Sequence, residues 1–337
     1  MSAAHTLVDL LAGRRDAATL GRGEWDGVIS AARAEAMLAT LAHRLADATV
    51  PPAVAALFAD QRAAAATAQQ QALWEAEMAR RALAPRGIEF VLLKGTAYAA
   101  AGLSCSEGRQ IGDLDILVIA PDVRRAENAL LNAGWEWVKS DPYDDHYYRE
   151  YMHELPPLIH KTRDRMIDVH HTILPRTHRT TPDALAMVSD AVRSHDGFAV
   201  LSPADMACHC AAHLIADGDL QGGLRNLWDF HCLTRDFAAA DAHFWGKLDG
   251  RAELHGLRAT VDRAARLARD IYGAELPPGW DRHVTGDGWF RRRLLARDDW
   301  GRSRNWLLQQ AFYLRSHWLR MPPAMLARHL WTKWRKR

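Results

Sequence analysis

The hydrophobic pattern changes abruptly near residue 85, and this change most restricts the possible folds. Residues 1–84 are rich in alanine and place apolar residues at helical spacing, with a break at Pro51-Pro52. After Pro85-Arg86-Gly87, the segment Ile88–Leu93 is short, largely apolar and bounded by a turn, as a buried strand should be. We therefore predict an N-terminal helical region, 1–84, followed by a core that contains a sheet.

Further short strands and one helix are predicted between residues 85 and 175. The strand candidates are Leu114–Ile119, Trp135–Val138 and a hairpin of Leu158–Lys161 with Met166–Thr172, and Val123–Leu131 has helical periodicity. From Ser202, a good N-cap before Pro203, helix dominates again. Later helices are predicted at about 220–235, 241–272, 287–299, 302–319 and 323–334. The fold class is α+β: a small α/β core, 85–175, between helical regions 1–84 and 176–337.

Composition and length indicate a globular chain. Its 337 residues are 48% hydrophobic and 25% charged, which are average values and exclude wholesale disorder. The four cysteines form no CxxC pair, so free thiols are expected. Neither a signal peptide nor a membrane-spanning run is apparent, so we expect a soluble, cytoplasmic protein.

The near-neutral formal charge of +2 hides an uneven distribution. Residues 291–337 contain thirteen Lys and Arg against two acids, a net of +11, which leaves the preceding chain at −9. Seven of the thirteen tryptophans lie between Trp280 and Trp334. This basic, Trp-rich end could bind RNA phosphates with stacking or an anionic membrane surface, or could simply be solvated.

Chemistry is concentrated around two carboxylates in a predicted strand. Side chains alternate along a strand, so Asp113 and Asp115 share one face while Leu114 and Ile116 enter the core. Paired carboxylates repel each other unless a cation lies between them, and Mg²⁺ prefers such oxygen ligands. Asp168 could supply a third carboxylate for a two-metal arrangement.

Neighbouring residues complete the predicted site. His170 shares the strand face of Asp168, while Ile167 and Val169 point the other way. Gly95, just after the first strand, would let backbone amides approach a phosphate at the start of the next helix.

These residues resemble a known superfamily. The run Leu92-Leu93-Lys94-Gly95, the later Arg109 and the segment 113–118 resemble the signature of the nucleotidyltransferases that include DNA polymerase beta. The particular likeness is to the bacterial family known as uncharacterised nucleotidyltransferase, over roughly residues 85–240. A strand at 167–170, a His-containing helix at 207–213 and an Arg-x-x-x-Asp helix at 224–229 extend it.

The resemblance implies a minimal nucleotidyltransferase core that transfers a nucleoside monophosphate from an NTP, with ATP as the expected donor. The metals, Mg²⁺ or Mn²⁺, would be held by the catalytic carboxylates Asp113, Asp115 and Asp168. The expected nucleotide-binding residues are Lys94, Gly95, Thr96, Arg109 and His170. Thr96 departs from the more common Gly-Ser or Gly-Gly, although its hydroxyl can contact a phosphate.

Several alternatives stay open. The acceptor could be a small molecule, a protein or RNA, as in a tRNA-modifying toxin, and an inactive binding protein could keep the same fold. His209 and His213 are spaced for zinc on one helix face, but packing or contact with the active-site cleft is favoured. Arg225 and Asp229 are four residues apart and are expected to form an ion pair or to join the helical half to the core.

Overall fold

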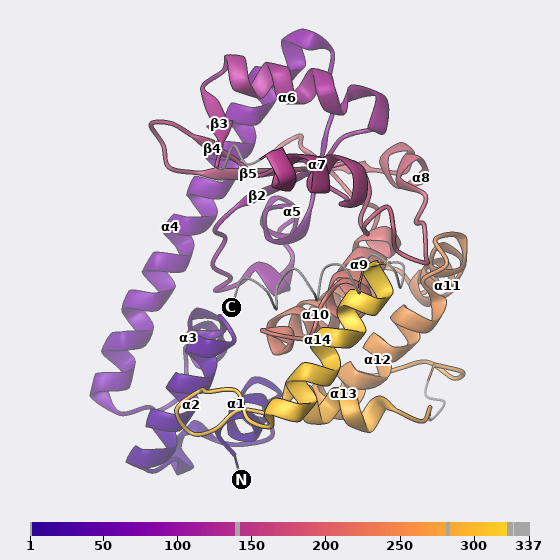
Figure 1. Ribbon diagram of the computed structural model, residues 1–337. Helices are drawn as coiled ribbons and strands as arrows, with labels where there is room; N and C mark the ends of the chain where they lie inside the picture. Colours follow the sequence, from indigo (N-terminus) through magenta and orange to yellow (C-terminus); the bar gives the residue numbers. More distant parts are fainter. Residues whose placement is uncertain (1, 139–141, 281–283, 322–325, 327–337) are drawn as a thin grey trace.

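A seven-stranded mixed sheet carries the candidate site, and helices surround it (Figure 1). The computed structural model describes residues 2–138, 142–280, 284–321 and 326. The strand order is β3-β4-β5-β2-β1-β7-β6. The strands are β1 (Val91–Leu92), β2 (Leu114–Leu117), β3 (Trp135–Trp137), β4 (Leu158–His160), β5 (Met166–His170), β6 (Val192–Arg193) and β7 (Ala199–Val200). The predicted α+β class is confirmed.

The helices form two groups joined by one long helix. In chain order they are α1 (Ala3–Leu11), α2 (Arg22–Ala34), α3 (Leu38–Arg44), α4 (Pro52–Leu83), α5 (Lys94–Ala100), α6 (Val123–Asn132), α7 (Pro142–Tyr151), α8 (Ala184–Ser189), α9 (Pro203–Ala211), α10 (Gly223–Ala240), α11 (Phe244–Leu254), α12 (Arg258–Tyr272), α13 (Asp287–Leu294) and α14 (Trp306–Arg320). Helix α4 contacts α3 at one end of the molecule and α5 and α6 beside the sheet (Figure 1). No helix in the described ranges is long and apolar enough to cross a membrane.

The register of the central strands places the site. Strands β2 and β5 pair in parallel, with Asp115 opposite Asp168, and β1 pairs antiparallel to β2. Leu114 and Ile116 are buried, as the predicted alternation requires. The predicted hairpin is confirmed, because β4 pairs antiparallel to β5 and Asp164 lies in the turn at φ +54°.

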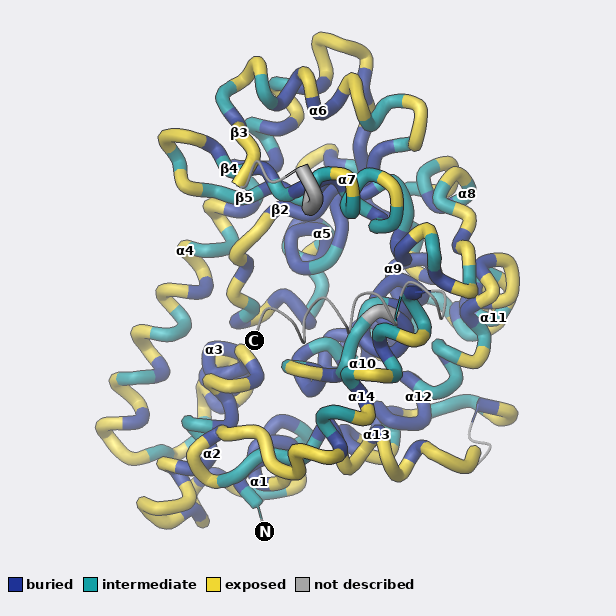
Figure 2. Tube along the Cα trace, in the orientation of Figure 1, coloured by how far each residue is buried: buried dark blue, intermediate teal, exposed yellow. Residues whose placement is uncertain are grey.

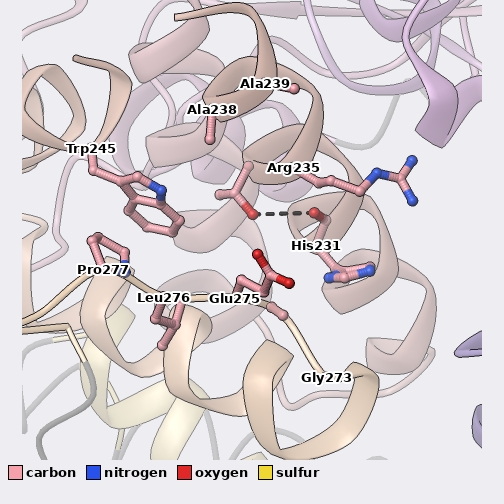
Figure 3. Close-up of a pocket in the computed structure, with 11 residues that line it drawn as sticks. His231, Arg235, Ala238, Ala239, Trp245, Gly273, Glu275, Leu276 and Pro277 are labelled. Atoms are coloured by element: carbon pink, nitrogen blue, oxygen red, sulfur yellow. Dashed lines mark hydrogen bonds between the residues drawn. The ribbon is translucent and has the colours of Figure 1, made fainter. Parts of the chain in front are cut away.

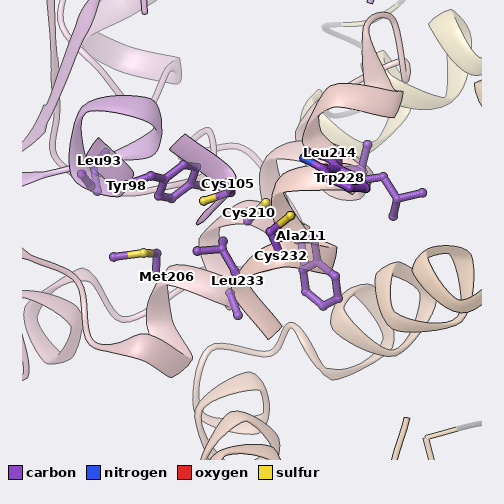
Figure 4. Packing of buried hydrophobic residues seen from close by; sticks show 14 of the residues in the cluster. Leu93, Tyr98, Cys105, Met206, Cys210, Ala211, Leu214, Trp228, Cys232 and Leu233 are labelled. Carbon is purple, nitrogen blue, oxygen red and sulfur yellow. The ribbon is translucent and has the colours of Figure 1, made fainter. Parts of the chain in front are cut away.

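A core of small and sulfur-containing side chains fixes α5 to the later helices. Figure 4 shows Tyr98 of α5 and Cys105 close to side chains of α9 and α10, including Cys210 and Cys232. All four cysteines are free and buried. Burial raises the pKa of the Cys232 thiol to about 12, so it stays neutral. Apolar packing therefore joins α5, which begins at Lys94, to the C-terminal helices.

Several predicted element bounds were wrong. The single helix expected at 241–272 is two helices, α11 and α12, because the chain turns at Gly256 with φ +64°. Helix α14 starts at Trp306 rather than 302, since the Asn305 side chain accepts a hydrogen bond from the Leu308 amide. Strands β6 and β7 were not predicted. The helix predicted at 323–334 lies, apart from Leu326, outside the described residues.

The predicted start of helix α9 is confirmed. The side chain of Ser202 accepts a hydrogen bond from the Asp205 amide, and Pro203 occupies the first turn. The Asp205 carboxylate also accepts a hydrogen bond from the Ser202 hydroxyl. This cap fixes where α9 leaves the end of β7 and turns toward the site.

Candidate active site

The three predicted carboxylates converge on one face of the central strands. Asp113 lies exposed just before β2, while Asp115 and Asp168 stand opposite each other on β2 and β5. Each offers an oxygen, and these oxygens all lie within 4.8 Å of one another. Two parallel strands in register therefore bring together carboxylates that are more than fifty residues apart in the chain.

Asp115 already has two partners. Its Oδ1 lies 2.7 Å from the Lys94 ammonium and 2.9 Å from His170 Nε2. Burial alone would raise the pKa of this carboxyl, but the Lys94 charge and the His170 hydrogen bond together hold it well below its usual range. Asp115 is therefore ionised and fixed in position.

Asp168 differs from Asp115 in that its pKa is raised and one of its oxygens is unsatisfied. Its Oδ1 is buried and hydrogen-bonds to no described residue. Burial, followed by repulsion from Asp115 and Asp113, raises its pKa to about 7. Within the described residues, Lys94 attracts this carboxyl so weakly that its pKa is still raised, and a bound cation would lower it. This donor set fits a hard divalent cation such as Mg²⁺ or Mn²⁺.

The turn after β1 is shaped by Arg109. Lys94 begins α5 with φ +48°, an uncommon value for a residue with a side chain, and thereby directs its ammonium toward Asp115. A Cβ on Gly95 would lie 2.6 Å from Arg109 Nε, so only glycine admits this arginine. Thr96 is buried, and its hydroxyl contacts no hydrogen-bonding partner in the described chain. The glycine requirement therefore arises here from a side chain within the protein.

Arg109 does not join the three carboxylates. Its guanidinium forms a close ion pair with Asp229 of α10. The same carboxylate lies 3.4 Å from Arg225 Nη1, and Arg225 also donates to the Ala36 carbonyl at 3.2 Å. The predicted Arg225–Asp229 ion pair is thus confirmed, and it joins the N-terminal helices, the core and α10. The partner of Arg109 was not predicted, because Asp229 lies 120 residues further along the chain.

A second group of side chains was missed by the sequence reasoning. The backbone after α7 pairs with the end of β5, with Glu154 bridged to His170. Glu154 Oε2 lies 3.4 Å from His170 Nε2, and the His153 and His170 rings are 5.2 Å apart. The sequence offered no signal beyond the residues Glu154 and His170 themselves, because an isolated β-bridge produces no periodic pattern. These side chains contact His170, which in turn is hydrogen-bonded to Asp115.

His209 also lies near this charge. Burial, then the positive charge of Lys94, lowers its pKa well below the usual range, so the ring is neutral. Among the described residues, neither His209 nor His213 belongs to a group of three potential metal ligands. The preference for packing or cleft contact over a zinc site therefore stays the better interpretation.

A separate cavity lies between helices of the C-terminal half. It has a volume of about 620 Å³ and is lined by α10 and by the segment 273–277 (Figure 3). Figure 3 shows the Trp245 indole on one side and His231 and Glu275 on another. None of the three converging carboxylates lines it. The cavity is therefore distinct from the site formed by the three carboxylates.

Comparison with family models assigns the chain to the nucleotidyltransferases. The matching model is described as uncharacterised nucleotidyltransferase and covers residues 22–273, well over half of the chain. The chain belongs to this family. The match is wider than the resemblance seen in the motifs, because it includes the helices from α2 to α4. A search of curated proteins finds no significant match.

Proposed function

We propose that the protein transfers a nucleoside monophosphate from an NTP to an acceptor hydroxyl or phosphate. The observation that carries this is the convergence of Asp113, Asp115 and Asp168, one of which has a raised pKa and an unsatisfied oxygen. Membership of the family supports nucleotidyl transfer in general. ATP is the proposed donor, and the cytoplasm is the proposed compartment.

The same three carboxylates are proposed to hold Mg²⁺ or Mn²⁺. When bound, the metal would neutralise charge on the transferring phosphate and lower the pKa of the attacking oxygen. Asp168, whose Oδ1 has no hydrogen-bond partner among the described residues, would gain a bound cation as its partner. His170 would keep Asp115 in one orientation through the 2.9 Å hydrogen bond to Oδ1.

Two residues are proposed to act directly on substrate. Lys94 is partly exposed, and its ammonium can leave Asp115 to donate to a phosphate oxygen of the donor. Asp168, once ionised, can accept the proton of an acceptor hydroxyl. We assign Arg109 to positioning, because its pairing with Asp229 fixes the turn that bears Lys94 and Gly95.

The test is labelling with each α-³²P-NTP in the presence of Mg²⁺ or Mn²⁺ and a cell extract as the source of acceptor. Asp113→Asn should reduce labelling at least a hundredfold while circular dichroism stays unchanged, because Asp113 is exposed. Asp164→Asn is the matched control, since this aspartate lies exposed in the hairpin turn and should keep activity within twofold. Full activity of Asp113→Asn would overturn the proposal.

The alternatives predict different results in the same assay. A binding protein that has lost catalysis would bind Mg²⁺ and NTP with intact folding but label nothing across a wide acceptor panel. An RNA acceptor would give labelled RNA, and binding would weaken steeply with salt. A small-molecule acceptor would give a labelled product that does not depend on the basic residues after Leu326.

A further inference from the structure

Helix α14 has two apolar faces; one is buried, and the other is largely exposed, with the Arg179 guanidinium 5.0 Å from the Trp318 ring centroid at its end. Leu308 and Phe312 are buried against the helical body. Leu307, Ala311, Leu314 and Trp318 are all exposed, at intervals of four, three and four residues, and therefore form one stripe along the helix. Leu307 is 72% exposed, and Leu314 and Trp318 are 47% and 44% exposed. We call these four residues the α14 stripe.

Further exposed tryptophans precede the α14 stripe in the chain. Trp300 and Trp306 are 75% and 66% exposed, and Trp289 of α13 is 60% exposed. Figure 2 shows the segment that leads into α14 as a largely exposed run on the outside of the molecule. Seven of the thirteen exposed large hydrophobic residues in the described chain lie between 284 and 318. Such clustering marks an interaction surface rather than scattered surface residues.

The charge around this surface is positive. Arg291, Arg292 and Arg304 line an open cavity of about 650 Å³ beside Trp289, and no acidic residue lines it. Asp298 accepts hydrogen bonds from the Trp300 and Arg302 amides at 2.9 and 2.8 Å. The outward charge beside the exposed tryptophans therefore comes from arginine.

Of the other two acids, Asp287 forms ion pairs within the protein, whereas Asp299 is exposed. Asp287 pairs with Arg263 and Arg266 at 2.9 and 2.6 Å. Asp299 accepts a hydrogen bond from the Ala3 amide at 3.3 Å. Residues 284–321 contain eight arginines against three aspartates, so the net charge that an approaching anion meets is positive.

We propose that the α14 stripe, together with Trp300 and Trp306, docks on an anionic phospholipid surface. Leucine and alanine side chains would enter the acyl boundary, tryptophans would lie at the headgroup level, and the arginines would bind lipid phosphates. This is peripheral binding and is independent of the proposed enzymatic function.

Two other occupants fit less well. A two-fold dimer through the α14 stripe would bring together two copies of the same arginine-rich surface, and this like charge is unfavourable. Single-stranded nucleic acid would gain from the tryptophans and arginines, but Leu307, Ala311 and Leu314 cannot stack on bases. A lipid surface can interact with all three components: the apolar α14 stripe, the tryptophans and the arginines.

The experiment measures co-sedimentation of the full chain with vesicles of phosphatidylcholine alone or with 30 mol% phosphatidylglycerol, at low and high salt. We expect binding only with the anionic lipid, weakened by salt, and a blue shift of tryptophan fluorescence. The variant Leu307→Gln, Leu314→Gln, Trp318→Gln should lower partitioning at least tenfold. The matched variant Leu185→Gln, Leu254→Gln, Trp74→Gln, at exposed positions elsewhere, should stay within twofold of wild type.

Each contrary outcome overturns the proposal. Absence of binding to anionic vesicles, or equal binding to neutral ones, would do so. Binding that persists in the α14 stripe variant would also do so, because that variant keeps residues 322–337. If wild type forms a dimer that the variant abolishes, without vesicle binding, a second copy covers the stripe. If only a single-stranded RNA oligonucleotide binds, the surface serves nucleic acid.

Discussion

Two carboxylate centres in this protein differ in how their charge is balanced. Asp229 lies between Arg109 and Arg225, so one negative charge meets two cations. At the group of Asp113, Asp115 and Asp168 the charge ratio is reversed, because among the described residues three carboxylates lie near one ammonium, that of Lys94. Both centres are held by side chains from distant parts of the chain, so distance along the sequence does not distinguish them.

We interpret this difference as one between a structural site and the proposed functional site. Buried charges are normally paired, and a surplus of negative charge is tolerated only where a ligand can supply the missing cation. The Asp229 centre is complete without a ligand and fixes helices together. The Asp168 carboxyl instead has a pKa raised to about 7, because burial and two neighbouring carboxylates are not fully offset by positive charge. The following predictions test this contrast.

The largest effect on stability is expected from Asp229→Ala. This change leaves Arg109 and Arg225 buried without their shared counter-charge, and we expect a loss of about 3–5 kcal/mol in the free energy of unfolding. Urea denaturation measures it. Asp113→Asn, at the exposed member of the carboxylate group, should change the stability of the metal-free protein by less than about 0.5 kcal/mol. Equal losses in the two variants would remove the distinction.

The second prediction concerns pH and Asp168. Because burial and like charges raise its pKa from 3.8 to about 7, the folded metal-free protein holds this proton more tightly than the unfolded chain. Wild-type stability from this group therefore falls as pH rises from about 4 to about 7, and Asp168→Asn avoids the loss. The variant should gain on the order of 3 kcal/mol relative to wild type between these pH values. Stability curves that remain parallel across this range would contradict it.

A smaller effect is expected at the turn that links the two centres. Gly95→Ala places a Cβ 2.6 Å from Arg109 Nε, so the arginine must shift away from Asp229 or the helix must move. We expect a loss of about 1–2 kcal/mol, after the better helix propensity of alanine is included. Gly250→Ala in α11 is the control, because its Cβ would meet no atom within 4 Å and should not destabilise. Equal thermal shifts for both variants would exclude the steric explanation.

The smallest effect is the stabilisation by added metal. Mg²⁺ or Mn²⁺ at ten times its dissociation constant should raise the unfolding free energy by about 1.4 kcal/mol, since it binds only the folded carboxylate group. Thermal unfolding with and without metal measures this gain. Asp113→Asn should lose most of it, whereas Asp164→Asn should keep it. A gain that survives in Asp113→Asn would place the metal elsewhere.

Much of the sheet could be predicted because its signals are local. The run 114–117 alternates between core residues and carboxylates, and the hairpin has a clear turn, so β2, β4 and β5 were found. Strands β6 and β7 have two residues each, too few to show a period. The convergence of Asp113, Asp115 and Asp168 followed from order and alternation. Whether they bind metal remains a prediction.

Partners that depend on long-range packing could not be predicted. Nothing near Arg109 in the sequence indicates Asp229, because their meeting depends on how α10 packs against the turn Ser104–Ser106. For the same reason Lys94 was expected to face phosphate, whereas it rests on Asp115 in this structure. The role of Glu154 beside His170 likewise depends on one isolated backbone bridge. Tertiary packing decides these contacts, and the local pattern carries no record of it.

The buried Glu35 has a consequence for synthesis of the chain. Its carboxylate pairs with Arg297 at 2.7 Å and accepts a hydrogen bond from the Leu224 amide at 3.1 Å. At about 5–20 residues per second, the ribosome needs tens of seconds after making Glu35 to deliver an arginine 262 residues later. Until then the end of α2 must stay hydrated, so the N-terminal helices cannot complete their packing on the nascent chain.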